Sequence, residues 1–243
     1  MKILIIRHGD PNYSIDSLTP KGWREAELLS RRLIQQPADA YYVSPLGRAL
    51  DTARPTLEKL GQEATVLPWL QEFRAKVTNP HTSEQMIPWN LSPQYWTKQK
   101  ELYDKDEWRT NGLFLTGNVE DIYRETADGM DALLASWGYV RDGAIYRCEK
   151  NTGATIVLFC HLAMGMTILS HMLGVSPAVM WHSFFMPTSS VTTLITEERV
   201  QGEVFFKCMQ MGDTSHLYAG NEPVSHAGLF QEIYGQGSVK KSQ

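Results

Sequence analysis

The stretch Lys2–Arg7 (KILIIR), followed directly by His8 and Gly9, decides how the rest of the chain is interpreted. Its central residues form a continuous apolar run rich in isoleucine, which is β-branched. A short run of this kind is typical of a strand buried on both faces, as in a parallel or mixed sheet. Gly9 and Pro11 then interrupt the run. We therefore predict a central strand that ends at Arg7 and a loop that begins at His8.

The segments after this strand alternate between helix and strand patterns. Thr19 and Pro20 indicate a helix start, because a threonine hydroxyl can cap a helix and proline fits its first position. Apolar residues then recur at steps of three and four, the helical period. Strand-helix-strand-helix-strand order is typical of an α/β fold. The predicted elements are a helix from residue 20 to about 36, a strand over 40–44, a helix over about 46–61 and a short strand over 65–67.

The second half of the chain continues this pattern after an interruption. Residues 73–117 are polar, contain proline and are rich in Trp and Tyr, so we expect an inserted cap whose aromatic residues serve mainly for packing. The whole chain, 1–243, is predicted to be one α/β domain, a mixed, mostly parallel sheet with helices on both faces. The later predicted elements are a helix over 120–138, a strand over Thr155–Cys160, a helix over Leu162–Leu173, a hairpin of 190–196 and 204–209, and a loosely held tail from about 220.

Composition excludes several classes of protein. Lys and Arg number 23 against 27 Asp and Glu, a net charge of −4, which argues against nucleic-acid binding through a broad basic surface. The three cysteines are widely spaced and form no disulfide framework, so we expect a reducing, cytoplasmic location. No apolar run approaches the roughly 18 residues that span a membrane. The sequence leaves the oligomeric state open, a homo-oligomer included.

Residues suited to phosphate chemistry stand at the ends of the predicted strands. Arg7 and His8 end the first strand, and His161 directly follows Thr155–Cys160. Arg48 stands in the first turn of the helix after the strand over 40–44, and Glu72 lies shortly after the third strand. Ligands of open α/β sheets bind beyond the carboxyl ends of the strands. We therefore expect these five residues to meet at one sheet edge, although they are remote in sequence.

The order and context of these motifs resemble the histidine phosphatase superfamily, also called the phosphoglycerate-mutase-like family. The resemblance covers most of the chain outside the cap and the tail, and implies a three-layer α/β sandwich. The matching motifs are Arg7-His8-Gly9, Leu18-Thr19 with Gly22 and Ala26, Ser44-Pro45 with Arg48-Ala49 and Thr52-Ala53, Leu70-x-Glu72, and the junction of the Thr155–Cys160 strand with His161.

The resemblance implies a role for each matching residue. His8 matches the nucleophile that accepts the phosphoryl group, and Glu72 matches the general acid. Arg7, Arg48 and His161 match the groups that hold the phosphate oxygens. An attacking imidazole must be neutral, and neighbouring arginine charges favour that form. Fixed cations stabilise the charge of the transferring phosphoryl group. No metal or cofactor is required in this scheme.

The sequence departs from the family pattern at two places. Pro11 and Ser14 stand where the family often has Thr and Asn in its Arg-His-Gly-x-Thr-x-x-Asn motif, and Asn12 or Ser14 is then the candidate phosphate donor of this loop. Leu162 follows His161 where the family often has Gly. Glu84 in the cap is the alternative to Glu72 as general acid.

We predict a metal-independent phosphomonoester hydrolase that acts on a small phosphorylated substrate through a phosphohistidine. The first alternative is a phosphoglycerate mutase, for which Arg74, Lys76 and Lys98 are the candidate carboxylate-binding residues. The second is an inactive family member that binds a phosphorylated ligand or a partner protein. The intact set of predicted site residues argues against the second alternative, since a binding module has no need for a nucleophile.

Overall fold

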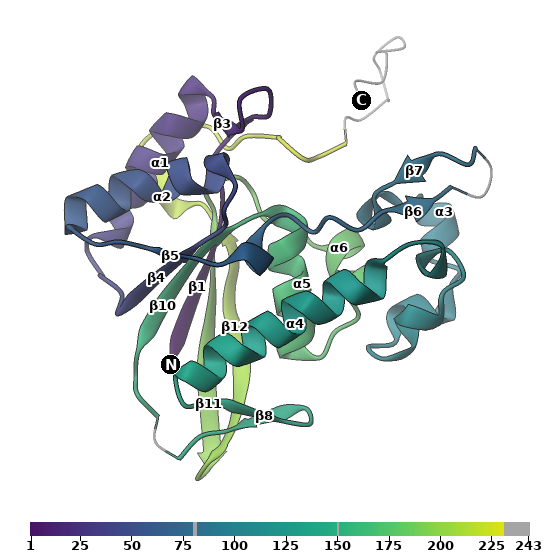
Figure 1. The fold of residues 1–243 in the computed structure, drawn as a ribbon. Coiled ribbons are helices and arrows are strands. Elements are labelled where there is room, and N and C mark those ends of the chain that lie inside the picture. Colours follow the sequence, from purple (N-terminus) through teal and green to yellow (C-terminus); the bar gives the residue numbers. More distant parts are fainter. Residues whose placement is uncertain (80–81, 150, 231–243) are drawn as a thin grey trace.

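A computed structural model of the chain describes residues 1–79, 82–149 and 151–230. Within these residues the central element is an eight-stranded sheet (Figure 1). Across the sheet the strands are, in order, β5 (Thr65–Val66), β4 (Ala40–Val43), β10 (Thr155–Cys160), β1 (Lys2–Arg7), β11 (Val191–Val200), β12 (Glu203–Asp213), β9 (Ile145–Arg147) and β8 (Val140–Asp142).

The sheet has a parallel half and an antiparallel half that meet at β1. The three pairings from β5 through β4 and β10 to β1 are parallel, and the four from β1 through β11, β12 and β9 to β8 are antiparallel. The predicted mixed sheet of an α/β protein is therefore confirmed, but the prediction that it is mostly parallel is wrong, since four of its seven pairings are antiparallel. The reason is that β11 and β12 extend beyond their predicted ranges and that the hairpin β8–β9 was not predicted.

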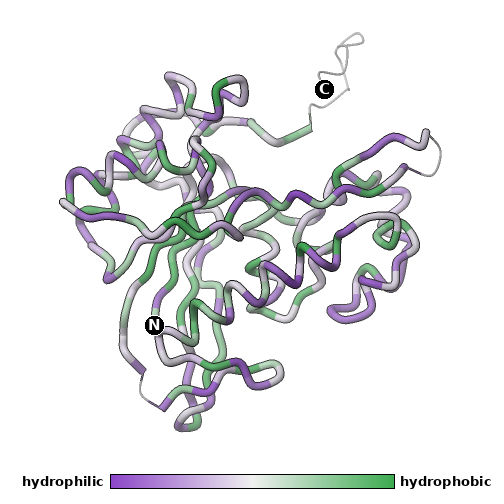
Figure 2. Tube along the Cα trace, viewed as in Figure 1, coloured by the Kyte–Doolittle hydropathy of each residue, from purple (hydrophilic) through white to green (hydrophobic). Residues whose placement is uncertain are grey.

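Helices cover both faces of the sheet, as predicted (Figure 1). On one face α1 (Pro20–Leu33) and α2 (Gly47–Leu60) pack together over a cluster that includes Ile6 and Val43, with α7 (Ser215–Ala219) beside α1. On the other face α4 (Val119–Ser136), α5 (Leu162–Leu173) and α6 (Pro177–Ser183) enclose a larger cluster that includes Ile3 and Ile5. Figure 2 shows the hydrophobic residues concentrated in the strands between these layers.

The helix ends have local causes. The Thr19 side chain accepts a hydrogen bond from Gly22 N, and Pro20 occupies the first turn, so α1 begins where predicted. It ends at Leu33, before the predicted end near residue 36. Gly61 and Gly174 adopt left-handed conformations, φ +61° and φ +65°, and end α2 and α5.

The described residues between 73 and 117 form 3₁₀ turns, two short paired strands and one four-residue helix rather than long helices. Their aromatic residues pack against α6: Phe73 lies 4.8 Å from Trp181 between ring centroids, and Trp96 stacks on His182 at 5.1 Å. Trp108 is fully buried. Packing is thus the role of these rings, as predicted. The short elements between β5 and α4 are η1 (Pro68–Leu70), β6 (Val77–Thr78), β7 (Gln85–Met86), η2 (Pro88–Asn90), α3 (Pro93–Trp96), η3 (Lys100–Tyr103), η4 (Glu107–Thr110) and η5 (Phe114–Thr116).

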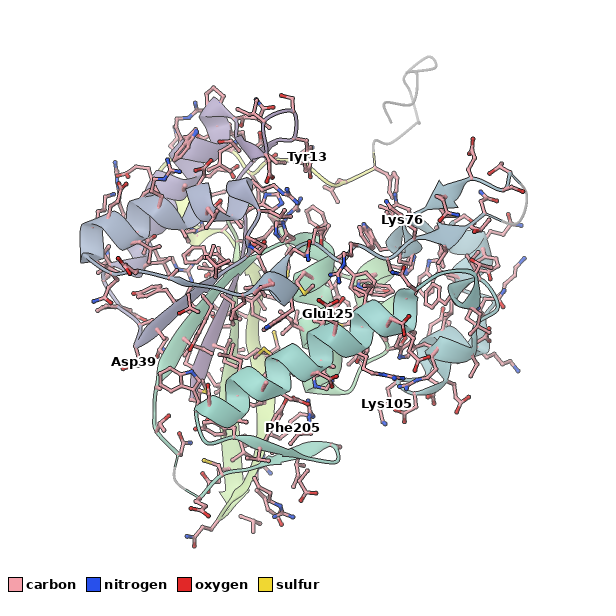
Figure 3. All side chains as sticks on the ribbon, in the orientation of Figure 1. Tyr13, Asp39, Lys76, Lys105, Glu125 and Phe205 are labelled. Atoms are coloured by element: carbon pink, nitrogen blue, oxygen red, sulfur yellow. The ribbon has the colours of Figure 1, made fainter. Side chains whose placement is uncertain are left out.

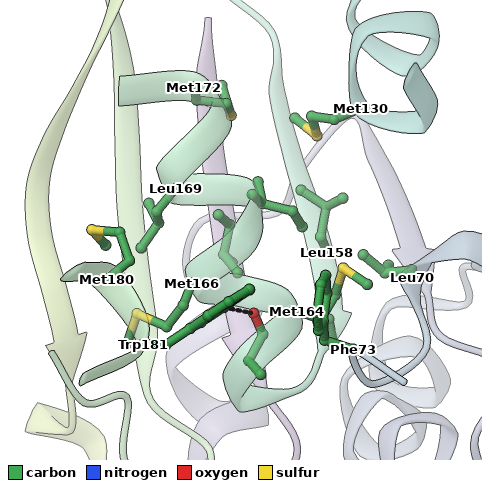
Figure 4. Packing of buried hydrophobic residues seen from close by; sticks show 14 of the residues in the cluster. Leu70, Phe73, Met130, Leu158, Met164, Met166, Leu169, Met172, Met180 and Trp181 are labelled. Carbon is green, nitrogen blue, oxygen red and sulfur yellow. Dashed lines mark hydrogen bonds between the residues drawn. The ribbon is translucent and has the colours of Figure 1, made fainter. Parts of the chain in front are cut away.

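The packing around α5 fixes the backbone on which part of the candidate site stands (Figure 4). The indole Nε1 of Trp181 donates to the Ala163 carbonyl at 3.3 Å and to Thr167 Oγ1 at 3.1 Å, which ties α6 to the first turns of α5. Buried Leu70 and Phe73 lie on either side of Glu72 in sequence and pack into the same cluster. The start of α5 and the Glu72 segment are therefore held in place by one core.

The loosely held tail that we predicted from about residue 220 is wrong for residues 222–227. Glu222 forms ion pairs with Lys21 and Arg24 of α1, and Ser225 Oγ donates to Asp10. The Ala227 carbonyl accepts from Arg7 at 2.9 Å. Side-chain and backbone partners at three points therefore attach this segment to the N-terminal part of the fold. Residues 231–243 of the predicted tail lie outside the described residues.

Candidate active site

The topology places His8 beside His161. Strands β1 and β10 are parallel neighbours, and Arg7 is in register with Cys160, so the next residue of each strand leaves the sheet at the same edge. The two imidazole centroids are 5.1 Å apart. Both side chains are buried, 1% and 0% exposed. Two histidines separated by more than half the chain thus form one pair, as the strand-end argument predicts.

The hydrogen bonds of His8 determine which ring nitrogen is free. Nδ1 lies 2.7 Å from the Gly9 carbonyl oxygen, which can only accept, so Nδ1 carries the proton. Nε2 then keeps its lone pair. Burial, together with the charges of Arg7 and Arg48, lowers the pKa of His8 to about 3. At neutral pH, His8 is therefore an uncharged imidazole in one fixed tautomer, the form that a nucleophile requires.

His161 has the same tautomer but leaves the other ring nitrogen without a partner. Its Nε2 lies 2.7 Å from Ser44 Oγ, whose oxygen also accepts from Leu46 N, and we assign the hydroxyl proton to the bond with Nε2. Nδ1 must then carry the ring proton. Burial lowers the pKa of His161 well below its usual value, helped by His8 and the two arginines. The result is a neutral ring whose Nδ1–H is buried and has no partner among the described residues.

Two buried arginines complete the cluster. Arg7 donates from Nη1 to the Met186 carbonyl at 2.7 Å and from Nη2 to the Ala227 carbonyl, while Arg48 Nη1 lies 2.5 Å from Asp16 Oδ1. The Nε of each arginine is buried without a partner within the described part of the chain. Leaving a buried donor unpaired costs about 1–3 kcal/mol. Three such N–H donors in the group around His8 are suited to the oxygens of a bound anion.

Hydrogen bonds from both helices of one layer position the loop of His8. Thr52 Oγ1 accepts from Gly9 N at 2.8 Å and donates to the Arg48 carbonyl at 2.7 Å, so one α2 side chain links the His8 loop to Arg48. The buried carboxylate of Glu25 on α1 accepts from Asp10 N at 2.9 Å. These contacts hold the loop on both sides of Gly9 and limit the motion of His8.

Glu72 is partly buried at the start of the cap segment. Its Oε1 accepts from Phe73 N at 2.9 Å and from Met164 N at 3.0 Å. Burial raises the pKa of this carboxyl, although the two N–H donors and the charges of Arg7 and Arg48 act in the other direction. Glu84 is instead exposed, and its carboxylate accepts from Thr82 Oγ1. Glu72 is thus the better candidate for a proton donor near neutral pH.

Asn12 and Ser14 do not join the cluster. Asn12 Oδ1 accepts from Ser14 N at 3.2 Å and from Ser14 Oγ at 2.6 Å, so the two side chains form a local turn at the surface. Among the described residues, neither side chain is hydrogen bonded to the two histidines or the two arginines. Their assignment as phosphate donors stays a prediction that this geometry does not support.

Sequence reasoning missed the partners that hold the two arginines. Asp16 accepts from Arg48 and from Gly47 N, and it adopts a left-handed conformation with φ +46°. An aspartate that precedes a strand does not indicate, from sequence alone, that it will bind an arginine. The partners of Arg7 are backbone carbonyls, which carry no side-chain signal at all.

Neither a metal cluster nor a membrane helix is found in the described residues. No group of three or more His, Cys, Asp or Glu side chains there is arranged to hold a metal ion. No helix in this part of the chain is long and apolar enough to cross a bilayer.

Comparison with known proteins identifies the fold and the family. The solved structures that resemble this chain include a phosphoserine phosphatase from Entamoeba histolytica, with 22% identity, a TM-score of 0.59 and coverage of 89% of this chain and 98% of that one. They also include a mycobacterial glucosyl-3-phosphoglycerate phosphatase, with 17% identity, a TM-score of 0.59 and coverage of 87% and 98%. An α-ribazole phosphatase from Shigella flexneri has 15% identity, a TM-score of 0.57 and coverage of 88% and 97%.

At these identities the structures establish the shared fold. Among curated proteins no match is found. The model of the histidine phosphatase superfamily (branch 1) matches residues 3–136, more than half of the chain, and this range includes Arg7, His8, Arg48 and Glu72. The protein therefore belongs to branch 1 of the histidine phosphatase superfamily.

Proposed function

We propose that the protein hydrolyses a small phosphate monoester through a phosphohistidine formed at His8. The observation that carries the proposal is a neutral His8 with a free Nε2, grouped with three buried N–H donors that lack partners. A nucleophile and an anion site thereby share one buried edge of the sheet. The solved structures of similar fold that carry the names of small-molecule phosphatases support the same assignment.

In the first step Nε2 of His8 attacks the phosphorus atom. A P–N bond forms while the bond from phosphorus to the leaving oxygen breaks. Glu72 transfers its proton to that oxygen, so an alcohol leaves. Nδ1–H of His8 keeps its hydrogen bond to the Gly9 carbonyl oxygen, and this bond stabilises the positive charge that the ring acquires. Arg7, Arg48 and His161 donate to the phosphoryl oxygens throughout.

In the second step water attacks the phosphorus atom of the phosphohistidine. Glu72, now ionised, accepts a proton from the water, and the P–N bond breaks. His8 recovers its neutral form and inorganic phosphate leaves. The protein's own side chains supply the nucleophile, the cations and the acid-base group of this cycle.

One observation in the cap, the pairing of Arg74, supports the choice of hydrolysis over phosphoglycerate mutation. Of the candidate carboxylate-binding residues, Arg74 forms an ion pair with Glu125, while Lys76 and Lys98 are exposed. A mutase would need cations committed to the substrate carboxylate. An assay on phosphoglycerates primed with 2,3-bisphosphoglycerate tests this choice, and interconversion faster than phosphate release would reverse it.

The direct test is hydrolysis of para-nitrophenyl phosphate in EDTA by the wild type, by His8→Ala and by His171→Gln. His171 lies at the opposite end of α5 from His161 and serves as the control histidine. We expect activity that survives chelation, is abolished in His8→Ala and persists in His171→Gln. Equal activity in His8→Ala would show that the nucleophile lies elsewhere. Phosphate binding without turnover of any ester would favour the binding-protein alternative.

A further inference from the structure

Each of the two arginines of the candidate site lies against an aromatic ring. Cζ of Arg48 is 5.4 Å from the centroid of Tyr13, and Cζ of Arg7 is 5.4 Å from the centroid of Phe185. Tyr13 comes from the loop between β2 (Pro11–Asn12) and β3 (Ser17–Leu18), and Phe185 follows α6. Two distant segments thus bring a ring to the groups that would hold the phosphate.

The Tyr13 ring is exposed although its loop is fixed. The ring is 67% exposed. Hydrogen bonds between Asn12 and Ser14 hold one side of the loop. On the other side, the Asp16 carboxylate accepts hydrogen bonds from Arg48 and from Gly47 N. Figure 3 shows Tyr13 near the α1–α2 layer and Lys76 of the cap on the other side of the sheet edge.

The C-terminal segment adds apolar surface near the same arginines. The Ala227 carbonyl bonds Arg7, and Gly228 lies so close that a Cβ there would be 2.9 Å from Arg7 Nη2. Leu229 and Phe230 follow directly and are 50% and 78% exposed. Apolar side chains therefore occur on several segments beside the phosphate-binding donors.

Of the cap's candidate cations, Arg74 is not free to bind an acidic leaving group, whereas Lys76 and Lys98 are exposed. The Arg74 guanidinium of the cap is already paired with Glu125. The carboxylate of Asp16 lies against Arg48 and would repel an acidic leaving group. Aromatic surface is what these segments present to the part of a substrate that adjoins the phosphate.

We infer that the site selects phosphate monoesters whose leaving group carries a flat apolar ring next to the phosphate, and that Tyr13 and Phe185 determine this specificity. The inference rests on the proposed hydrolase activity and names the substrate class for it. The exposed face of Tyr13 would contact the ring of the leaving group, while the two arginines bind the phosphate.

Benzyl phosphate and glycerol 3-phosphate test this inference, because both release an alcohol and only benzyl phosphate carries a ring. The measured quantity is kcat/KM for benzyl phosphate divided by that for glycerol 3-phosphate. This ratio cancels any effect of a variant on phosphate binding itself. We expect Tyr13→Ala and Phe185→Leu each to lower the ratio by roughly two- to tenfold, the range found for aromatic contacts. Tyr13→Phe keeps the ring and should keep the ratio.

Tyr218→Ala is the matched control, since this tyrosine is 91% exposed on α7 and contacts neither arginine. It should leave the ratio unchanged. A wild-type ratio near one, or a ratio that survives both ring substitutions, would overturn the inferred specificity while leaving the hydrolase intact. Failure of the wild type to hydrolyse either ester or para-nitrophenyl phosphate would instead overturn the proposed function, and the inference with it.

Discussion

At the scale of single residues, the protonation states of the candidate site follow from burial. Burial lowers the pKa of His8 and raises the pKa of Glu72, so both groups are displaced toward their neutral forms. The proposed chemistry needs both neutral forms, because a neutral imidazole attacks the phosphorus atom and a neutral carboxyl group protonates the leaving oxygen. Sequence alone predicted that His8 and His161 meet, since each directly follows one of two neighbouring parallel strands. It could not predict that Asn12 and Ser14 bond each other or that carbonyls hold Arg7, because these depend on local backbone geometry.

The pH dependence of kcat/KM follows from these two shifts. Glu72 must be protonated, and because its folded pKa is raised, the acid form persists at low pH and is lost as pH rises through that pKa. His8 must be neutral, so activity falls on the acid side only as pH drops through about 3. We expect Glu72→Gln to remove the alkaline fall and to lower kcat/KM for benzyl phosphate by roughly 10²- to 10⁴-fold.

Para-nitrophenyl phosphate provides the control for this prediction, because para-nitrophenolate leaves without a proton more readily than an alkoxide does. Its hydrolysis should fall much less in Glu72→Gln than that of benzyl phosphate. An equal fall for the two esters would assign Glu72 a structural role.

At the scale of elements, the candidate site depends on how closely α1 approaches the loop of His8. A Cβ at Gly22 of α1 would lie 2.2 Å from the Asp10 carbonyl oxygen, so only glycine permits this contact.

Strands β1 and β10 have the bounds that the sequence predicts, because continuous apolar runs mark strands buried on both faces. Strands β8 and β9 were not predicted, since three residues are too few to show an alternating pattern.

Gly22→Ala tests this close approach of α1 to the loop of His8. The added methyl group would push the loop of Asp10 away from α1, at a cost of about 1–3 kcal/mol in the free energy of unfolding. Because His8 lies on that loop, kcat/KM should fall as well. Gly112→Ala is the control, since a Cβ there meets nothing within 4 Å. Urea unfolding and kinetics of the two variants measure both effects, and a Gly22→Ala protein as stable and active as Gly112→Ala would contradict the account.

At the scale of the whole molecule, the candidate site is assembled from both halves of the chain and from its C-terminal segment. The N-terminal half supplies His8 and both arginines, β10 leads to His161, and residues 222–227 return to α1 and Arg7. The sequence predicted the first two contributions from the parallel strands. It could not predict the third, because the segment lacks an apolar pattern and is attached by ion pairs and a carbonyl.

Ending the chain after Asn221 tests the contribution of this segment. The sheet and the helices of both layers precede the cut, so the protein should still fold. Arg7 would lose a charged hydrogen bond, an interaction worth about 1.5–3 kcal/mol, and kcat/KM for benzyl phosphate should fall roughly tenfold or more. A chain ended after Phe230 keeps these contacts and is the control. Equal kcat/KM in the two shortened chains would show that the segment is dispensable.

The central claim is that His8 itself carries the phosphoryl group during turnover. Rapid quenching of the protein with ³²P-labelled benzyl phosphate, followed by peptide mapping at alkaline pH, where phosphohistidine survives, tests this most directly. The account predicts an acid-labile label on the peptide that contains His8, absent from His8→Ala and present in His171→Gln. Label on another residue, or phosphate release by His8→Ala at the wild-type rate, would contradict it.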